Sequence, residues 1–154
     1  MKDYGYYQSP IGLIEIIADD KIISLGFVTE IVDDNLINPN NLVINQCLMQ
    51  LDQYFKQELT TFNLPLNIKG TPFQELVWKQ ASKIPYGKTI TYQELAQKIN
   101  KPTAVRAVGS ALGKNRLAIF IPCHRVVASN NKIINYFWGK ERKLFLQRLE
   151  KIVT

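Results

Sequence analysis

Two contrasting halves meet near residue 70 of this chain, and they constrain its fold more than any other feature of the sequence. Residues 1–70 carry a net charge of −5, whereas residues 71–154 carry +11. A change of this size within one chain indicates two units with separate roles. With 154 residues, 46% of them apolar, the chain is long enough for two small cores. We therefore predict an α+β protein with one domain over residues 1–66 and a second over residues 67–154.

Strand signals come first in the acidic half. Apolar, β-branched runs at 13–17 and 22–28 flank the polar segment 19–21, a pattern typical of a β-hairpin. Apolar residues then recur at helical spacing over 42–56, and Cys47 lies on their apolar face. The first domain is therefore predicted to be an α/β scaffold in which Cys47 packs rather than reacts.

Well-specified helix starts dominate the basic half. Thr71 is followed by Gln74, and Thr91 by Glu94, at the spacing of a capping box. A further helix is predicted over 104–112. The last two of these helices are short and separated by a tight break, which is the outline of a helix-turn-helix. The same outline fits an ordinary helical hairpin, so the pattern alone leaves both open.

Two further elements are predicted near the carboxyl end. The apolar run 119–121 resembles a short strand. A final helix is predicted over 140–150, with Leu144, Phe145 and Leu149 as its inner face.

Cys123 stands directly beside His124, the only histidine of the chain. Cysteine attacks electrophiles as the thiolate, and a free thiol has a pKa of about 8.5. A neighbouring base can generate the thiolate at neutral pH. The plain alternative is a packed cysteine beside a hydrogen-bonded histidine. With one histidine and two cysteines, the chain has too few ligands for a His/Cys zinc site, and we expect no metal.

The basic half favours a polyanionic partner, because neutralising phosphates releases condensed counterions. Arg106 is the single long cation among the small residues of 104–111, which suits close approach to a surface. A basic surface that only confers solubility is the alternative.

No apolar run approaches the roughly 18 residues of a membrane span, so we expect no membrane partner. The first residues lack the apolar core of a signal peptide. We therefore expect a cytoplasmic protein, or a nuclear one in a eukaryote.

Taken together, the motifs of the basic half resemble the O6-alkylguanine-DNA alkyltransferase family, whose members repair DNA by direct reversal. The resemblance implies an amino-terminal α/β domain with an RNase H-like fold. It implies a mostly helical second domain with a helix-turn-helix and the reactive cysteine, and no cofactor. The matching residues, in the family's order and spacing, are Thr71-Pro72-Phe73-Gln74, Ile84-Pro85-Tyr86-Gly87-Lys88-Thr89, Thr91-Tyr92, Arg106-Ala107-Val108-Gly109, Asn115, Ile121-Pro122-Cys123-His124-Arg125-Val126-Val127, Asn135-Tyr136, Lys143 and Glu150.

The resemblance assigns the chemistry to five residues. It implies that Cys123 takes an alkyl group irreversibly from O6 of guanine, and also from O4 of thymine, so that each molecule acts once. His124, acting through a water, deprotonates Cys123, and Glu150 orients His124. Asn115 braces the turn that carries the cysteine. Tyr92 presses on the target phosphate and assists protonation of the departing guanine.

The resemblance also implies double-stranded DNA containing O6-alkylguanine as the partner, bound by a monomer. Arg106 enters the minor groove from the recognition helix and fills the space left by the flipped nucleotide. The other residues that the resemblance places on DNA are Tyr92, Thr103, Ala104, Ala107, Ser110 and Arg125.

The predicted base pocket departs from the family pattern. The family has small residues where this chain has Phe137 and Trp138, and prolines at the positions of Arg116 and Ala118. Two bulky aromatics narrow a pocket, so we expect methyl adducts to be accepted better than large ones. The predicted pocket residues are Val126, Tyr136, Phe137 and Trp138.

Two other functions stay open at this point. A non-catalytic lesion sensor or helix-turn-helix regulator accounts for the basic half and the helix pair, but it has no need of Cys123. A cysteine hydrolase accounts for Cys123 and His124, but not for Arg106 on its small-residue helix.

Overall fold

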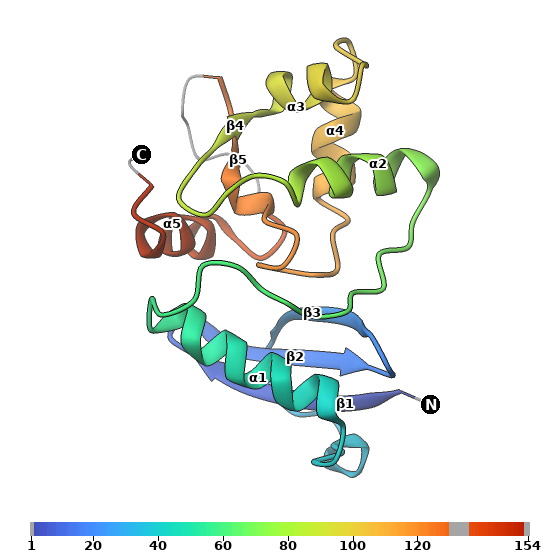
Figure 1. The fold of residues 1–154 in the computed structure, drawn as a ribbon, viewed down its shortest axis with the longest axis vertical. Helices are drawn as coiled ribbons and strands as arrows, with labels where there is room; N and C mark the ends of the chain where they lie inside the picture. Colours follow the sequence, from blue (N-terminus) through green and yellow to red (C-terminus); the bar gives the residue numbers. More distant parts are fainter. Residues whose placement is uncertain (1, 130–135, 153–154) are drawn as a thin grey trace. The chain divides into compact units, whose positions relative to one another are not determined.

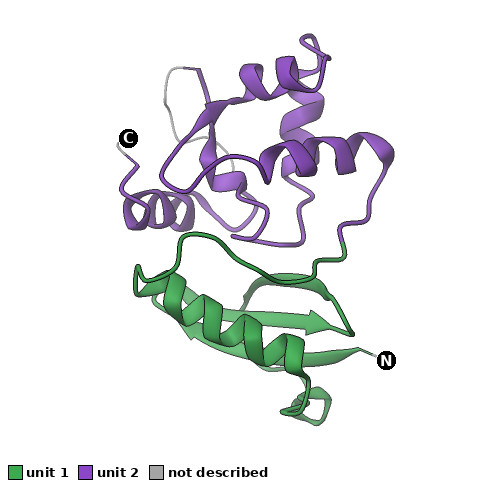
Figure 2. Cartoon of the chain, in the orientation of Figure 1, with its two compact units in different colours: residues 1–67 green, residues 68–154 purple. Residues whose placement is uncertain are grey.

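The chain folds into two compact units, residues 1–67 and residues 68–154 (Figure 2). The computed structural model describes residues 2–129 and 136–152, so Asn135 of the matching motifs lies outside the described part. The predicted domain boundary falls one residue before the observed division.

Unit 1 is a three-stranded antiparallel sheet with a helix packed against it (Figure 1). Its strands are consecutive neighbours: β1 (Asp3–Ser9), β2 (Gly12–Ala18) and β3 (Ile22–Val28). Helix α1 (Leu42–Phe55) contacts β1 and β2, and a 3-10 turn, η1 (Asp34–Leu36), precedes it. Buried residues of this unit include Ile14, Ile16, Leu25, Ile44, Cys47 and Leu51.

Strand β1 is the strand of unit 1 that we did not predict. Its tyrosines are half-exposed on both faces, so no apolar alternation marks the strand. Gly5 lets α1 approach this strand, because a Cβ at that position would collide with the side chain of Ile44.

Unit 2 is mostly helical, and its helices start where the capping signals place them. Both capping boxes form: Thr71 with Gln74, and Thr91 with Glu94. No helix in residues 2–129 and 136–152 is long and apolar enough to cross a membrane. The elements of this unit are α2 (Pro72–Ala81), β4 (Ile90–Thr91), α3 (Tyr92–Lys98), α4 (Val105–Leu112), η2 (Cys123–Arg125), β5 (Val126–Val127) and α5 (Lys140–Leu149).

A short parallel pairing brings two distant segments of unit 2 together. Ile90 of β4 pairs with Val126 of β5, and Thr91 pairs with Val127. Helix α3 begins directly after β4, and η2 ends directly before β5. The start of α3 and the cysteine turn are therefore held side by side.

The predicted strand over 119–121 is wrong, because this segment forms consecutive tight turns. The Phe120 amide donates to the Ala118 carbonyl at 2.7 Å, and the Ile121 amide donates to the Leu117 carbonyl at 2.9 Å. Ile119 has a φ of 70°, a conformation that strains a β-branched residue. Compact backbone, not an extended strand, leads into the cysteine.

Candidate active site and nucleic-acid interface

Asn115 holds the turn that presents Cys123. It is 2% exposed, and its Oδ1 accepts from the Leu117 amide at 2.8 Å. Its Nδ2 has three acceptors within reach: the Leu117 carbonyl at 3.3 Å, the Ile121 carbonyl at 3.0 Å and Cys123 Sγ at 3.1 Å. The side chain thus joins both ends of the turn and directs an N–H at the sulfur.

The Cys123 thiol needs a base to react at neutral pH. Burial raises its pKa to about 12, although the hydrogen bond from Asn115 and the charge of Lys143 oppose this rise. In the thiol form, Sγ donates to the Leu112 carbonyl at 3.5 Å. The surroundings therefore favour a stored thiol that becomes a thiolate only when a base removes its proton.

His124 is placed to be that base. Its Nε2 lies 2.6 Å from Glu150 Oε2, and because an ionised carboxylate only accepts, Nε2 carries the hydrogen. Nδ1 then has a free lone pair, and it has no hydrogen-bond partner in the described part of the chain. Burial lowers the pKa of His124, although Glu150 opposes this change. The lowered pKa favours the neutral imidazole. Among the described residues no hydrogen bond joins His124 to Cys123 Sγ, so a proton passing between them needs a relay.

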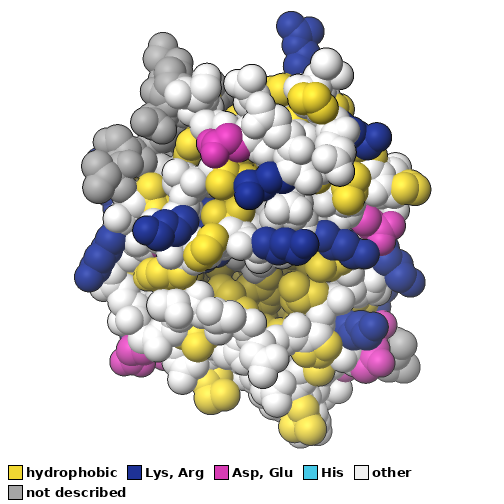
Figure 3. All heavy atoms as spheres, turned by 45° about the horizontal axis from the view of Figure 1, so that its top comes forward, with side chains coloured by type: hydrophobic (Ala, Val, Ile, Leu, Met, Phe, Trp, Pro, Cys, Tyr) yellow, Lys and Arg dark blue, Asp and Glu magenta, His cyan; other side chains and the backbone are white. Residues whose placement is uncertain are grey.

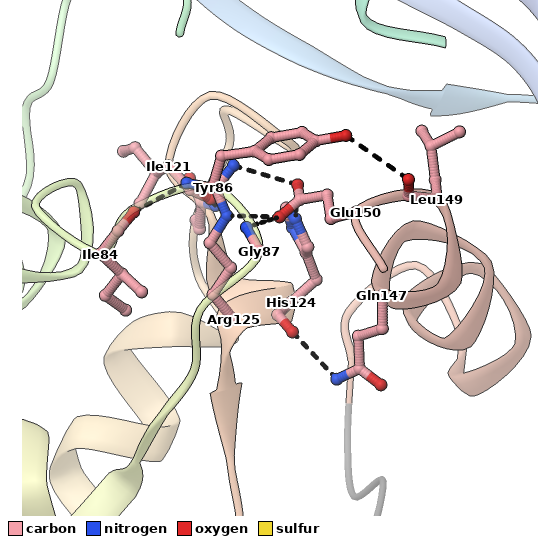
Figure 4. Close-up of polar contacts among 10 residues, drawn as sticks. Ile84, Tyr86, Gly87, Ile121, His124, Arg125, Gln147, Leu149 and Glu150 are labelled. Carbon is pink, nitrogen blue, oxygen red and sulfur yellow. Dashed lines mark hydrogen bonds and ion pairs between the residues drawn. The ribbon is translucent and has the colours of Figure 1, made fainter. Parts of the chain in front are cut away.

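Glu150 accepts hydrogen bonds from several sides at the end of α5 (Figure 4). Besides His124, it accepts from Arg125 and from the Gly87 amide at 3.2 Å. Burial raises the pKa of its carboxyl, but the hydrogen bonds from His124 and Arg125 and the charge of Arg125 outweigh burial and hold the pKa well below its usual range. Gly87 has a φ of 77°, and a Cβ there would lie 3.2 Å from the Glu150 carbonyl oxygen, so this position requires glycine.

The predicted DNA contact of Arg125 is wrong. Arg125 is only 7% exposed, and its guanidinium is committed to Glu150 and to the Ile84 carbonyl. A buried carboxylate needs a compensating charge, and Arg125 supplies it.

A pocket of about 640 Å³ opens beside the cysteine. Tyr92 at the start of α3 lines it, as do Arg106 and Ser110 of α4 and Cys123. The other lining residues are Val105, Gly109, Leu112, Gly113, Tyr136 and Phe137. The helix-turn-helix and the cysteine turn therefore share one cavity.

The outer face of α4 carries the other predicted DNA contacts. Arg106, Ala107 and Ser110 are exposed there, and Thr103 is exposed just before the helix, whereas Ala104 is half-buried. Small side chains on this face allow a surface to come close. Figure 3 shows Lys and Arg side chains exposed on one face of the molecule, and no histidine on that face.

Only part of the predicted base pocket lines the cavity. Tyr136 and Phe137 do, and Phe137 is 68% exposed. Val126 and Trp138 are not among the lining residues: Val126 is buried in β5, and Trp138 packs edge-on against Phe137 with ring centroids 4.9 Å apart. Trp138 thus contacts the aromatic wall formed by Tyr136 and Phe137 without lining the cavity itself, which corrects the predicted direct contact.

Two residues of α5 have roles in the site that sequence reasoning did not assign. Lys143 is fully buried, its Nζ donates to the Val126 carbonyl at 2.9 Å, and it lies 5.8 Å from the centroid of the Tyr92 ring. Burial lowers the pKa of Lys143 to about 8. Gln147 donates to the His124 carbonyl at 3.0 Å and fixes the backbone of the base. The only sequence signal for these roles was that Lys143 matches the family motif.

Two family profiles together match nearly the whole chain. The ribonuclease-like domain of 6-O-methylguanine DNA methyltransferase matches residues 3–68, and the DNA binding domain of the same family matches residues 72–152. The chain belongs to the 6-O-methylguanine DNA methyltransferase family. Every residue of the site described above lies in the family's DNA binding domain.

Full-length similarity to named family members agrees with this membership. A probable methylated-DNA–protein-cysteine methyltransferase of Acanthamoeba polyphaga mimivirus is 47% identical over 148 residues, covering 94% of this chain and 93% of that protein. The crystal structure of Mycobacterium tuberculosis O6-methylguanine methyltransferase has a TM-score of 0.86 at 38% identity, covering 98% and 93% of the two chains. The structure of Mycobacterium tuberculosis OGT in complex with DNA has a TM-score of 0.87 at 39% identity, covering 97% and 92%. These similarities confirm the predicted α+β class and the resemblance to the family.

Within the described residues of this family member, no group of three or more His, Cys, Asp or Glu side chains is arranged to hold a metal ion. Of the prolines that the family has near the cysteine, this chain replaces one with Arg116, which donates to the Lys69 carbonyl at 3.2 Å. The other is replaced by Ala118, which is fully buried.

Proposed function

We propose that this chain repairs alkylated double-stranded DNA by transferring a methyl or other alkyl group from O6 of guanine, and also from O4 of thymine, to the sulfur of Cys123. The observation that carries the proposal is the pocket, which is lined by the thiol of Cys123, by Tyr92 and by the cation of Arg106. Relatives in Mycobacterium leprae and Methanosarcina barkeri, 39% and 42% identical over 94% and 96% of this chain, are named methylated-DNA–protein-cysteine methyltransferases.

The reaction begins with extrusion of the damaged nucleotide, because O6 of guanine lies inside the base stack. Arg106 projects from α4 and occupies the vacated space, while phosphate contacts hold the duplex. The hydroxyl of Tyr136 has no partner in the described part of the chain and belongs to a residue that lines the pocket, so it is available to the extruded base.

Transfer of the alkyl group then follows from the placement of His124 as the general base. A water passes the Cys123 proton to Nδ1 of His124, while the Nε2–H of His124 remains hydrogen-bonded to Glu150. The thiolate attacks the alkyl carbon, so that a C–S bond forms as the C–O6 bond breaks. Tyr92 donates a proton to the departing guanine, and the imidazolium returns a proton to Tyr92 through water. The products are neutral guanine, neutral His124 and a thioether at Cys123.

A thioether is not hydrolysed in water at neutral pH, so each chain acts once. We propose that it acts as a monomer and without a cofactor. We also propose a cytoplasmic location, or a nuclear one in a eukaryote. A reducing compartment of this kind keeps thiols free, and both Cys47 and Cys123 are free.

Intact mass measured after incubation with O6-methylguanine duplex tests this function. We expect one methyl group per chain and no further uptake with excess duplex. Unchanged mass with retained DNA binding would instead support a lesion sensor, and turnover of an ester or amide would support a cysteine hydrolase.

Replacing Arg106 with alanine should slow repair of duplex DNA by about ten- to a hundred-fold, because extrusion of a nucleotide costs a few kcal/mol that Arg106 helps to offset. Transfer from free O6-methylguanine base should change by less than about twofold, since no duplex is opened. Single-turnover rates with the two substrates measure the difference.

Lys114→Ala is the matched control for Arg106→Ala, because it removes the same charge from an exposed residue just beyond α4. It should slow duplex repair only slightly. An equal loss with both substrates in Arg106→Ala would mean that Arg106 does not act in the opened duplex.

The aromatic wall should restrict the size of the adduct. We expect O6-methylguanine in DNA to react more than about tenfold faster than O6-benzylguanine, because Phe137 lines the pocket and Trp138 supports it. The variant Phe137→Ala/Trp138→Gly should narrow this ratio, as measured by single-turnover rates with both adducts. Equal rates in the unmodified protein would contradict a narrowed pocket.

A further inference from the structure

Arg125 forms a two-point ion pair with the carboxylate that orients the base (Figure 4). Its Nε donates to Glu150 Oε1 at 2.8 Å and its Nη2 donates to Oε2 at 3.0 Å. Its Nη1 donates to the Ile84 carbonyl at 2.8 Å, which fixes the plane of the guanidinium. The same Oε2 accepts from His124 at 2.6 Å, so one carboxylate is shared between a permanent cation and the imidazole.

This sharing bears on the charge of His124, in addition to the effect of burial. A buried carboxylate that faced only an imidazole would favour the protonated imidazolium, because only an ion pair with the imidazolium could then compensate its negative charge. An imidazolium cannot accept the proton of Cys123. When an arginine has already compensated the carboxylate, the imidazole can stay neutral and still be oriented by its Nε2–H.

We propose that Arg125 is a positioning residue that neutralises Glu150, so that His124 remains an uncharged base with its Nδ1 lone pair open to the proton of Cys123. The arginine does not touch the reacting atoms. It acts through the carboxylate, and it does so from the residue directly after the base.

Lys143 is the other cation near His124, and it acts in the same direction as Arg125. Glu150 at the end of α5 is the negative group that faces His124, and Arg125 of η2 and Lys143 of α5 are the positive groups. Burial and both cations lower the pKa of His124, against the raising effect of Glu150. Lys143 donates to the Val126 carbonyl, whereas Arg125 binds the carboxylate of Glu150 directly through two N–H groups.

The inference rests on the proposed function, since a neutral base matters because Cys123 is the nucleophile. Its test does not need alkyl transfer. His124 is the only histidine of the chain, so a long-range proton–nitrogen NMR spectrum of protein with 15N-labelled histidine reports its tautomer and its titration without assignment. A protein that fails to take up methyl can still give the predicted titration, and the reverse also holds.

The experiment compares the unmodified protein with Arg125→Met, Arg125→Gln and Arg125→Lys over pH 5 to 8. We expect the unmodified protein to hold the Nε2–H tautomer at pH 7. Arg125→Met should raise the titration midpoint of His124 by at least about one pH unit, because Glu150 is then compensated by the imidazole alone. Arg125→Lys keeps the positive charge and should restore most of the original midpoint.

Arg125→Gln keeps a hydrogen-bond donor for Glu150 without the charge, and it is the variant to compare if Arg125→Met does not give a dispersed amide spectrum. A folded neutral variant with an unchanged midpoint would overturn the proposal and leave Arg125 a structural role alone. An imidazolium in the unmodified protein at pH 7 would overturn it without any variant.

Discussion

Replacing Cys123 with serine should abolish methyl uptake while binding of O6-methylguanine duplex persists. A hydroxyl is a far weaker nucleophile at neutral pH than a thiol whose proton a base can remove. The change keeps the size of the side chain, so the pocket and the phosphate contacts that give most of the affinity remain. Intact mass and a gel-shift titration on the same sample measure the two properties.

Cys47→Ala is the matched control for this change. Cys47 is fully buried in unit 1, burial raises the pKa of its thiol above the usual range, and it lies outside the domain that holds the site. This variant should still take up one methyl group per chain. Methyl uptake that survives in Cys123→Ser would place the nucleophile elsewhere.

Replacing Glu150 with glutamine should lower the free energy of unfolding by about 3–5 kcal/mol, the range measured when one partner of a buried ion pair is removed. The amide cannot compensate the charge of Arg125. In either orientation its NH₂ group faces a donor of Arg125, together with that of His124 at the Oε2 position or that of Gly87 at the Oε1 position. Transfer should also slow, because His124 loses the acceptor that fixes its tautomer. Urea denaturation and single-turnover rates measure the two effects.

The pH dependence of this loss follows from the depressed pKa of Glu150. A carboxyl whose pKa is lower in the folded state contributes its full stability above its unfolded pKa of about 4.3. That contribution disappears as the pH falls through the lower, folded pKa. The difference in stability between the unmodified protein and Glu150→Gln should therefore shrink below about pH 4.

Glu141→Gln serves as the control, because Glu141 is exposed in the first turn of the same helix. Its unfolding free energy should change by less than about 1 kcal/mol. A Glu150→Gln protein as stable as this control would show that the buried carboxylate is not the centre of the network.

Local signals predicted the elements that depend on local chemistry. Thr71 with Gln74 and Thr91 with Glu94 satisfy amide groups at the starts of α2 and α3, and this requirement is set within four residues of sequence. Helix α4 also ends at Leu112, as the predicted range 104–112 has it. Neither prediction depends on how the chain packs over long range.

The buried face of α5 could not be predicted from hydrophobic periodicity. Apolar spacing indicated Leu144, Phe145 and Leu149, of which none is fully buried, whereas Lys143 and Gln147 are. Buried polar residues such as Lys143 and Gln147 look solvent-exposed in the sequence, because hydrophobic periodicity reflects the polarity of a side chain and not its hydrogen-bond partners in the fold.

Arg125 shows the same limit at a single residue. A basic side chain beside the cysteine, in a domain that binds a polyanion, resembles a phosphate contact. Its partner, Glu150, lies 25 residues further along the chain, and only the fold brings the two together. The neighbouring pair Cys123 and His124 was visible in the sequence, but the direction of each His124 nitrogen was not.

The chemistry assigned to the sulfur is tested most directly by peptide mass spectrometry after reaction with a duplex whose O6-methylguanine carries a ¹³C-labelled methyl group. We expect the label on the peptide that contains Cys123, none on the peptide that contains Cys47, and an equal amount of restored guanine in the DNA. Label on any other side chain, or label released as methanol from an unmodified protein, would contradict irreversible transfer to Cys123.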